Sequence, residues 1–300
     1  MCGIVGFLDR RGDTQLGATL LNMLNALACR GPDSAGVALF GVEVPGRFVV
    51  RLKLGDRGDL EERARSVTSA AVPFEAKDFA RTGAYLRFSI AGSADVNRFI
   101  REVESIAPDV EVVSIGRRLE IVKQVGSPAN LEGAFHISAA GGRHGLGHTR
   151  LSTESIVDLS HSQPFWGHGF PDLAIVHNGH ITNYHLLRRR YEQRGIRFYT
   201  ENDSEIIAIY LALRLREGVT LEGAFQGMLR DLDGSFSCLA ATEDSLGFVK
   251  DPFSLKPLVF AESDGFVAVA TEEIAIRGAL PGDYTVREAQ AREIRVWRRN

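Results

Sequence analysis

The chain has 300 residues, of which 44% are hydrophobic and 24% charged, and this composition is that of an ordinary globular protein. With 35 Lys and Arg against 38 Asp and Glu, the net charge of −3 lacks the positive excess that a nucleic-acid-binding protein needs, and no apolar run is long enough to span a membrane. The start carries no secretory signal, and three cysteines without paired spacing argue against a disulfide scaffold or a zinc ribbon and favour the reducing cytoplasm.

The first part of the chain alternates strand and helix patterns. Residues 3–8 form a short apolar run that predicts a buried strand, and residues 15–28 carry leucines at helical spacing. The helix should end before Gly31 and Pro32, because Gly followed by Pro cannot continue it. Further strands are predicted at 36–40 and 47–54.

The middle of the chain has a different character. Residues 56–82 are charged and show no periodic pattern. They precede a predicted β-α-β-β unit, with a strand at 84–91, a helix at 94–106, and strands at 110–115 and 118–125. We interpret this unit as an insert, over about 56–130, within a single domain of residues 1–300. It has no Cys or His, so a packed scaffold or a docking module is favoured over a second catalytic site.

Strand patterns dominate again from residue 134. The predicted strands are 134–139, 145–151, 173–177, 235–242, 246–250, 257–261 and 266–270, and the predicted helices are 184–194, 204–216 and about 221–229. The basic tail at 292–300 is expected to be solvated. Because the helices come in pairs between groups of strands, the pattern predicts two sheets with helices outside them.

Cys2 is the first residue whose position suggests chemistry. If Met1 is removed, a thiol and a free α-amine lie on one residue, and an amine with a pKa of about 8 can act as the general base for its own nucleophile. The alternative is that Cys2 is only a small residue. The short apolar strand flanked by Gly3 and Gly6 would hold Cys2 on a rigid edge, and Gly3 would let a ligand approach the backbone closely.

Three later segments add polar groups of complementary kinds. Arg150, at a predicted strand end, can bind a carboxylate through two parallel hydrogen bonds, or it is simply a surface arginine. Asn178 and Gly179 can form an oxyanion hole, or a tight turn. Asp203 can bind an ammonium group, or belong to an ordinary helix cap. Together these groups suit an α-amino acid with a reactive side-chain carbonyl, for which glutamine is the obvious candidate.

Five segments in one order resemble the class II glutamine amidotransferase domains, which belong to the N-terminal-nucleophile hydrolases. They are MCGIVGF at 1–7, RGPDSAG at 30–36, GHTRLST at 147–153, HNGHITNY at 177–184 and TENDSE at 200–205. The resemblance implies an α+β fold, an αββα four-layer sandwich, here with the inserted β-α-β-β subdomain. It implies no metal and no cofactor.

The resemblance also implies a role for each matching residue. Cys2 would be the nucleophile, with its own α-amine as general base and acid. Asn178 and Gly179 would form the oxyanion hole. Arg150, with Thr153 nearby, would bind the glutamine α-carboxylate, Asp203 would bind the α-ammonium, and Arg30 would organise the site. The residues to which the resemblance gives a role are therefore Cys2, Arg30, Arg150, Thr153, Asn178, Gly179 and Asp203.

The ammonia acceptor is expected on another chain. The sandwich pattern ends at about residue 275, and no phosphate-binding loop follows before Asn300. The long insert and the Thr-Glu-Ser after Ser152 resemble the amidotransferase subunit of N-methylglutamate synthase and glutamate-synthase-like systems. That resemblance implies partner subunits like the flavin-binding and Gly-rich portions of glutamate synthase.

Two other functions stay open at this point. The first is a catalytically silent subunit that senses glutamine or holds a complex together, which the presence of Cys2 disfavours. The second is an N-terminal-nucleophile hydrolase that cleaves another amide. Arg150 together with Asp203 favours a free α-amino acid as substrate and argues against that second function.

Overall fold

The larger of two facing sheets has β1 near its centre. A computed structural model, which describes residues 2–12, 14–152 and 157–299, gives it seven antiparallel strands. In spatial order they are β15 (Val286–Glu288), β13 (Val259–Glu262), β14 (Phe266–Ala270), β1 (Gly3–Asp9), β8 (His144–Arg150), β2 (Ser34–Phe40) and β7 (Leu119–Val125). Every residue of β1 is buried, as expected for an apolar strand covered on both faces.

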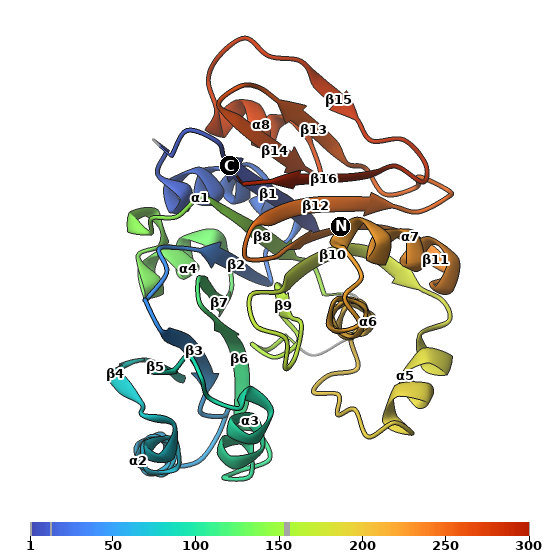
Figure 1. Ribbon diagram of the computed structural model, residues 1–300. Helices are drawn as coiled ribbons and strands as arrows, with labels where there is room; N and C mark the ends of the chain where they lie inside the picture. The colour runs from blue at the N-terminus through green and yellow to red at the C-terminus, as the bar shows by residue number, and fades with distance from the viewer. Residues whose placement is uncertain (1, 13, 153–156, 300) are drawn as a thin grey trace.

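The second sheet has five antiparallel strands and packs face to face with the first (Figure 1). Its order is β16 (Ile294–Arg298), β12 (Ser245–Lys250), β11 (Gly234–Ala241), β10 (Ala174–Ile181) and β9 (Phe165–Trp166). Apolar side chains from both sheets, among them Ile4, Leu146 and Leu239, fill the space between them. Alternation along β1 sends Ile4 into this space and Val5 toward the helices on the opposite face.

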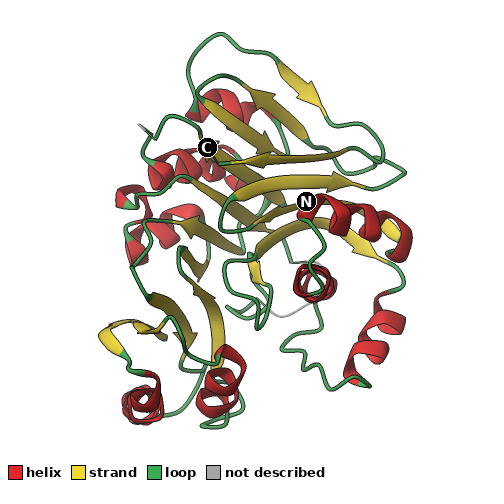
Figure 2. Cartoon of the chain, viewed as in Figure 1, coloured by secondary structure: helices red, strands yellow, loops and turns green. Residues whose placement is uncertain are grey.

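Helices cover the outer face of each sheet (Figure 2). The seven-stranded sheet is covered by α1 (Leu16–Ala26), α4 (Pro128–Phe135) and α8 (Glu273–Ala279). The five-stranded sheet is covered by α6 (Asp203–Arg216) and α7 (Leu221–Asp231), and α5 (Tyr184–Glu192) packs on α6. The result is the predicted αββα four-layer sandwich. None of the helices in the described ranges is long and apolar enough to cross a membrane.

A third, four-stranded sheet lies beside the sandwich, at the lower left of Figure 1. Its order is β4 (Lys77–Thr82), β5 (Tyr85–Ala91), β3 (Arg47–Lys53) and β6 (Glu111–Gly116), and it carries α2 (Leu60–Ala71) and α3 (Val96–Glu104). We call β3 to β6 with α2 and α3 the inserted unit. Its buried residues, such as Val50 and Phe99, form one continuous apolar cluster with Ile4 and Leu239 of the sandwich.

The inserted unit differs from the predicted β-α-β-β arrangement. It begins with β3, and the strand at 118–125 is not part of it, because β7 pairs with β2 in the seven-stranded sheet. The segment 56–82, which showed no pattern, contains α2 and β4. The α2 helix buries only Val67 and Ala71, and all of β4 is exposed, so neither element needs a periodic apolar face.

Two further sequence predictions are wrong. The strand predicted at 134–139 is instead the end of α4 followed by a short 3₁₀ turn. A capping box between Ser127 and Asn130 starts α4 at Pro128, and the helix continues to Phe135. The basic tail is not simply solvated. Its strand β16 pairs with β12 and packs the buried Trp297 against Phe248.

Buried histidines on β8 make the stability of the fold depend on pH. Burial lowers the pKa of His148 to about 3 and that of His144 to about 4. Each ring is therefore neutral in the folded chain but binds a proton below pH 6.5 when unfolded. Above pH 7.5 these rings are neutral in both the folded and the unfolded chain, so they add no pH dependence to the free energy of unfolding. It should fall by about 1.2 kcal/mol for each histidine between pH 6 and pH 5.

Urea unfolding at several pH values measures this slope, and His148→Gln is the informative variant. We expect the slope between pH 6 and pH 5 to decrease by about 1.2 kcal/mol per pH unit in the variant, with equal slopes above pH 7.5. An unchanged slope in His148→Gln would show that this ring is protonated in the folded chain.

Candidate active site

The structure brings most of the predicted site residues into one pocket of about 510 Å³. Cys2 directly precedes β1, and Arg150 is the last residue of β8. Asn178 and Gly179 lie in β10, and Asp203 is the first residue of α6. The remaining lining residues are Leu151, Ser152, Gln163, His177, His180, Tyr184, His185, Arg188, Glu201, Asn202 and Ser204. Thr153, the other predicted carboxylate-binding residue, lies outside the described residues.

Cys2 lies directly before β1, at the end of the sheet where this central strand begins. The pairing of Gly3 with Thr149 aligns β1 with the end of β8, so the Cys2 thiol lies beside Leu151. The Leu151 N–H donates a hydrogen bond to Cys2 Sγ at 3.4 Å. A side chain at Gly3 would approach Thr149 Oγ1 to 2.8 Å, so glycine is needed here for packing beneath Cys2. Packing therefore requires this glycine, and the close approach of a ligand to its backbone stays a prediction.

Asn178 and Gly179 are not in a tight turn. Both lie within β10 and pair with Ser237 and Phe236 of β11. The Asn178 side-chain amide donates a hydrogen bond to the Cys2 carbonyl at 3.1 Å. Gly179 has φ +150°, and a side chain there would collide with the Ser235 carbonyl. Asn178 is thus bonded to the backbone of Cys2, and both it and Gly179 line the same pocket as Cys2, an arrangement suited to stabilising an oxyanion.

Asp203 begins α6 but does not cap it. The N-cap is Asn202, whose side chain accepts a hydrogen bond from the Ser204 N–H at 3.0 Å. The Asp203 carboxylate accepts the Ile181 N–H at 2.8 Å and has the Nδ1 atom of His180 3.6 Å away. A carboxylate at a helix N-terminus is favoured by the helix dipole. Asp203 therefore presents negative charge to the pocket, which suits an ammonium group.

Arg150 is almost fully buried at the end of β8, with 4% of its surface exposed. Burial lowers the pKa of its guanidinium, while Cys2, Asp158 and Asp33 oppose this effect, and the group stays charged at neutral pH. Its carbonyl accepts the Asp33 N–H at 3.0 Å, and a side chain at Gly31 would approach the Arg150 nitrogen to 2.5 Å. The Arg-Gly-Pro-Asp segment thus packs directly on the backbone of Arg150.

Arg30 lies behind the pocket rather than in its lining. Its Nε donates to the Cys2 carbonyl at 3.4 Å, and its Nη1 forms an ion pair with Glu272, the N-cap residue of α8. Together with the bond from Asn178, this contact fixes the carbonyl of the nucleophile. The organising role of Arg30 stays a prediction, and these are the contacts through which it would act.

Gln163 and His177 were missed by sequence analysis. The Gln163 side chain accepts the His177 N–H at 2.6 Å and donates to the His177 carbonyl at 3.0 Å. The Gln163 side chain thereby makes the two backbone hydrogen bonds that a neighbouring strand would otherwise make with His177, the residue before Asn178. The His177 ring contacts Ser204 Oγ at 2.9 Å. No spacing pattern marks Gln163, because its partner is a backbone segment reached only through the tertiary fold.

The described part of the chain holds no group of three or more His, Cys, Asp or Glu side chains that could bind a metal ion. The polar groups that line the pocket include the Cys2 thiol, the Asn178 amide, the Arg150 guanidinium and the Asp203 carboxylate. Such a set can bind both charged ends of an α-amino acid and attack its side chain.

The four layers are those of an N-terminal-nucleophile amidotransferase fold. The glutamine phosphoribosylpyrophosphate amidotransferase of B. subtilis superposes with a TM-score of 0.63 at 20% identity, over 98% of this chain and 47% of that one. A family model described as "Glutamine amidotransferase domain" matches residues 148–278.

Two relatives match nearly the whole chain. The "Glutamine amidotransferase-like protein GlxB" of Rhizobium meliloti is 39% identical over 92% of this chain and 91% of its own length. A "Putative glutamine amidotransferase" of Methanothermobacter thermautotrophicus is 34% identical over 99% of both chains. The chain belongs to the class II glutamine amidotransferase family.

Proposed function

We propose that this protein hydrolyses glutamine to glutamate and ammonia through a thioester on Cys2, and passes the ammonia to a synthase on a separate chain. The convergence of the Cys2 thiol, the Asn178 amide, Arg150 and Asp203 in one pocket carries this proposal. Arg150 would bind the α-carboxylate of glutamine and Asp203 its α-ammonium. The side-chain amide would then lie at the thiol.

The first half of the reaction forms the thioester. The free α-amine of Cys2 takes the thiol proton, and the sulfur attacks the amide carbon. Asn178 Nδ2 and the Gly179 N–H stabilise the resulting oxyanion, and the second N–H of the Asn178 amide is available for this while the first bonds the Cys2 carbonyl. The amine then returns its proton to the leaving nitrogen, so the C–N bond breaks and ammonia departs.

The second half regenerates the thiol. The same amine removes a proton from water, and the hydroxide attacks the thioester carbon. The C–S bond breaks, glutamate leaves, and the proton held by the amine returns to sulfur. Each proton is accounted for within Cys2, so the chemistry uses no other acid or base.

The acceptor of ammonia is proposed to lie on partner chains that resemble the flavin-binding and Gly-rich portions of glutamate synthase, as in N-methylglutamate synthase. Two relatives that match this chain over nearly their whole length are named as glutamine amidotransferase or glutamine amidotransferase-like, which supports the glutamine-hydrolysing half of the proposal. Purifying the untagged complex and identifying its partner chains by mass tests this. Partners without flavin-binding or glutamate-synthase-like sequence would contradict it.

Glutamate release by purified protein, combined with intact-mass measurement, tests the chemistry. We expect activity only in molecules that begin at Cys2, because with Met1 attached the base would be a non-basic amide nitrogen. Full activity in molecules that retain Met1 would contradict the amine base. Tight glutamine binding without glutamate release would instead indicate a silent sensor.

A further inference from the structure

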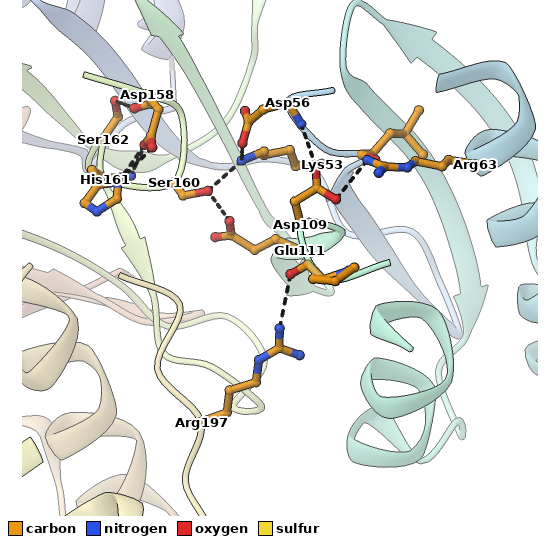
Figure 3. Close-up of polar contacts among 12 residues, drawn as sticks. Lys53, Asp56, Arg63, Asp109, Glu111, Asp158, Ser160, His161, Ser162 and Arg197 are labelled. Atoms are coloured by element: carbon orange, nitrogen blue, oxygen red, sulfur yellow. Dashed lines mark hydrogen bonds and ion pairs between the residues drawn. The ribbon is translucent and has the colours of Figure 1, made fainter. Parts of the chain in front are cut away.

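The inserted unit contacts two segments that line the glutamine pocket. One is the loop 157–163, which ends at Gln163, and the other is the segment 195–202, which carries Glu201 and Asn202. Both contacts are made by side chains rather than by strand pairing, as Figure 3 shows for the first of them. The hydroxyl bonds of Ser160 and Tyr199 can each be removed by a single substitution, whereas Arg197 additionally pairs with Glu104 at 3.6 Å and donates to the Pro108 carbonyl at 3.3 Å.

The first contact centres on Ser160 (Figure 3). Lys53, at the end of β3, donates to Ser160 Oγ at 2.7 Å, and the Ser160 hydroxyl donates to Glu111 of β6 at 2.5 Å. Lys53 is buried and also bonds Asp56 at 2.7 Å. The two adjacent strands β3 and β6 thus hold one loop residue from both sides.

The loop transmits this position to the pocket because it is internally bonded. Asp158 accepts the His161 N–H at 2.7 Å and faces the His161 ring at 2.8 Å, while Ser162 Oγ donates to the Asp158 carbonyl at 2.6 Å. Gln163 follows directly and holds the backbone of His177. A shift of Ser160 would therefore displace the edge of β10 beside the oxyanion donors.

The second contact centres on Glu104, the last residue of α3. Its carboxylate is buried and accepts the Tyr199 hydroxyl at 2.7 Å and the Val112 N–H at 3.0 Å. Burial alone would raise the pKa of Glu104, but hydrogen bonds from His168, Val112 and Tyr199 outweigh it and hold the pKa below its usual range. The group is thus a charged acceptor, which strengthens the bond from Tyr199.

Tyr199 is tied to the start of α6. The N–H groups of Tyr199 and Thr200 donate to the two carboxylate oxygens of Glu205, at 2.8 and 2.9 Å. Glu205 lies in the first turn of α6, two residues after Asp203. Asn202 Nδ2 also donates to the His161 carbonyl at 3.3 Å, so the two segments are joined at the pocket.

We propose that the inserted unit sets the affinity for glutamine, with Ser160 and Tyr199 as the positioning residues through which it acts. Neither side chain lines the pocket, but each fixes a segment that does. Ser160 acts on the loop ahead of His177 and Asn178, and Tyr199 acts on the segment that leads to Asp203. This inference rests on the proposed function only in taking glutamine as the ligand of the pocket.

The test measures the Kd of L-glutamine by titration calorimetry in a Cys2→Ala parent, which removes turnover from the measurement. Tyr199→Phe and Ser160→Ala each delete one hydroxyl, and we expect each to raise the Kd ~10-fold, within the usual range for coupling between sites. Ser160→Thr keeps a hydroxyl and should restore a Kd close to that of the parent.

Two matched controls remove hydroxyl–carboxylate bonds of similar length elsewhere. Tyr210→Phe loses a 2.6 Å bond to Asp231, and Ser138→Ala loses a 2.6 Å bond to Glu132. Neither residue lines the pocket or contacts the inserted unit through these bonds. Both controls should keep the Kd within about twofold of the parent, because a bond that is not coupled to the pocket does not alter the affinity for glutamine.

The outcomes separate this inference from the proposed function. Equal Kd values in Tyr199→Phe, Ser160→Ala and both controls would overturn the inference even where wild-type protein hydrolyses glutamine. A selective rise in Kd would support it even where wild-type protein fails to release glutamate. A parent that does not bind glutamine at all would overturn both.

Discussion

Replacing Cys2 by alanine should lower glutamate release from glutamine by at least ~10⁴-fold, because no other group in the pocket can form the thioester. The fold should persist. The Cys2 side chain is half-buried, and within the described residues its sulfur forms hydrogen bonds only with backbone atoms of Leu151. The melting temperature should therefore change by only a few degrees, as for a substitution outside the core.

The other two cysteines are natural controls for this experiment. Cys29 is exposed, and Cys29→Ala should leave both activity and stability near wild type. Cys238 is buried against α6 and α7, so Cys238→Ala should lower stability and leave the turnover of folded enzyme unchanged. Glutamine hydrolysis by Cys2→Ala at more than a trace level would refute the nucleophile assignment. In the complex, synthesis from free ammonia should survive the substitution.

Removing either charge of the substrate clamp should have the next largest effect. Arg150→Ala and Asp203→Asn should each lower kcat/KM for glutamine by roughly 30-fold to several thousand-fold, which corresponds to about 2–5 kcal/mol for a charge left buried and unpaired. Asp203→Asn is the cleaner variant. An asparagine oxygen can still accept the Ile181 N–H, so the local backbone bond at 2.8 Å is kept while the charge is lost.

Substrate analogues distinguish binding of each charge from general damage. For a glutamine analogue without the α-amino group, kcat/KM should be nearly the same in Asp203→Asn as in wild type. For an analogue without the α-carboxylate, kcat/KM should be nearly the same in Arg150→Ala as in wild type. The loss should appear mainly in KM if both charges bind ground state and transition state alike. An unchanged KM for glutamine in both variants would refute the clamp, and an equal loss on every analogue would indicate structural damage instead.

Sequence alone was sufficient where the determining interactions are local. The apolar run of β1, the leucines of α1 and the Gly-Pro break after it predict those elements because each is set by neighbouring residues. The αββα sandwich and the positions of Cys2, Arg150, Asn178 and Asp203 also followed from the sequence, through five segments in a family's order. The pocket brings these four side chains together, and their catalytic roles stay predictions.

Tertiary structure alone decided which strands share a sheet. The strand at 119–125 joins β2 rather than the inserted unit, and the tail strand at 294–298 joins β12, because strand pairing is chosen by residues far away in the sequence. Exposed elements such as β4 show no apolar alternation from which they could be predicted. Periodicity records which face of an element is buried, but not what covers it.

The same limit applies to the residues that support the site. Gln163 holds the backbone of His177, Glu272 pairs with Arg30, and Glu104 reaches Tyr199 across 95 positions of the chain. None of these partners stands at a spacing that marks it, because each contact is made only after the sheets have packed. The residue types of the reaction were therefore visible in the sequence, whereas the side chains that position them were decided by the packing of distant segments.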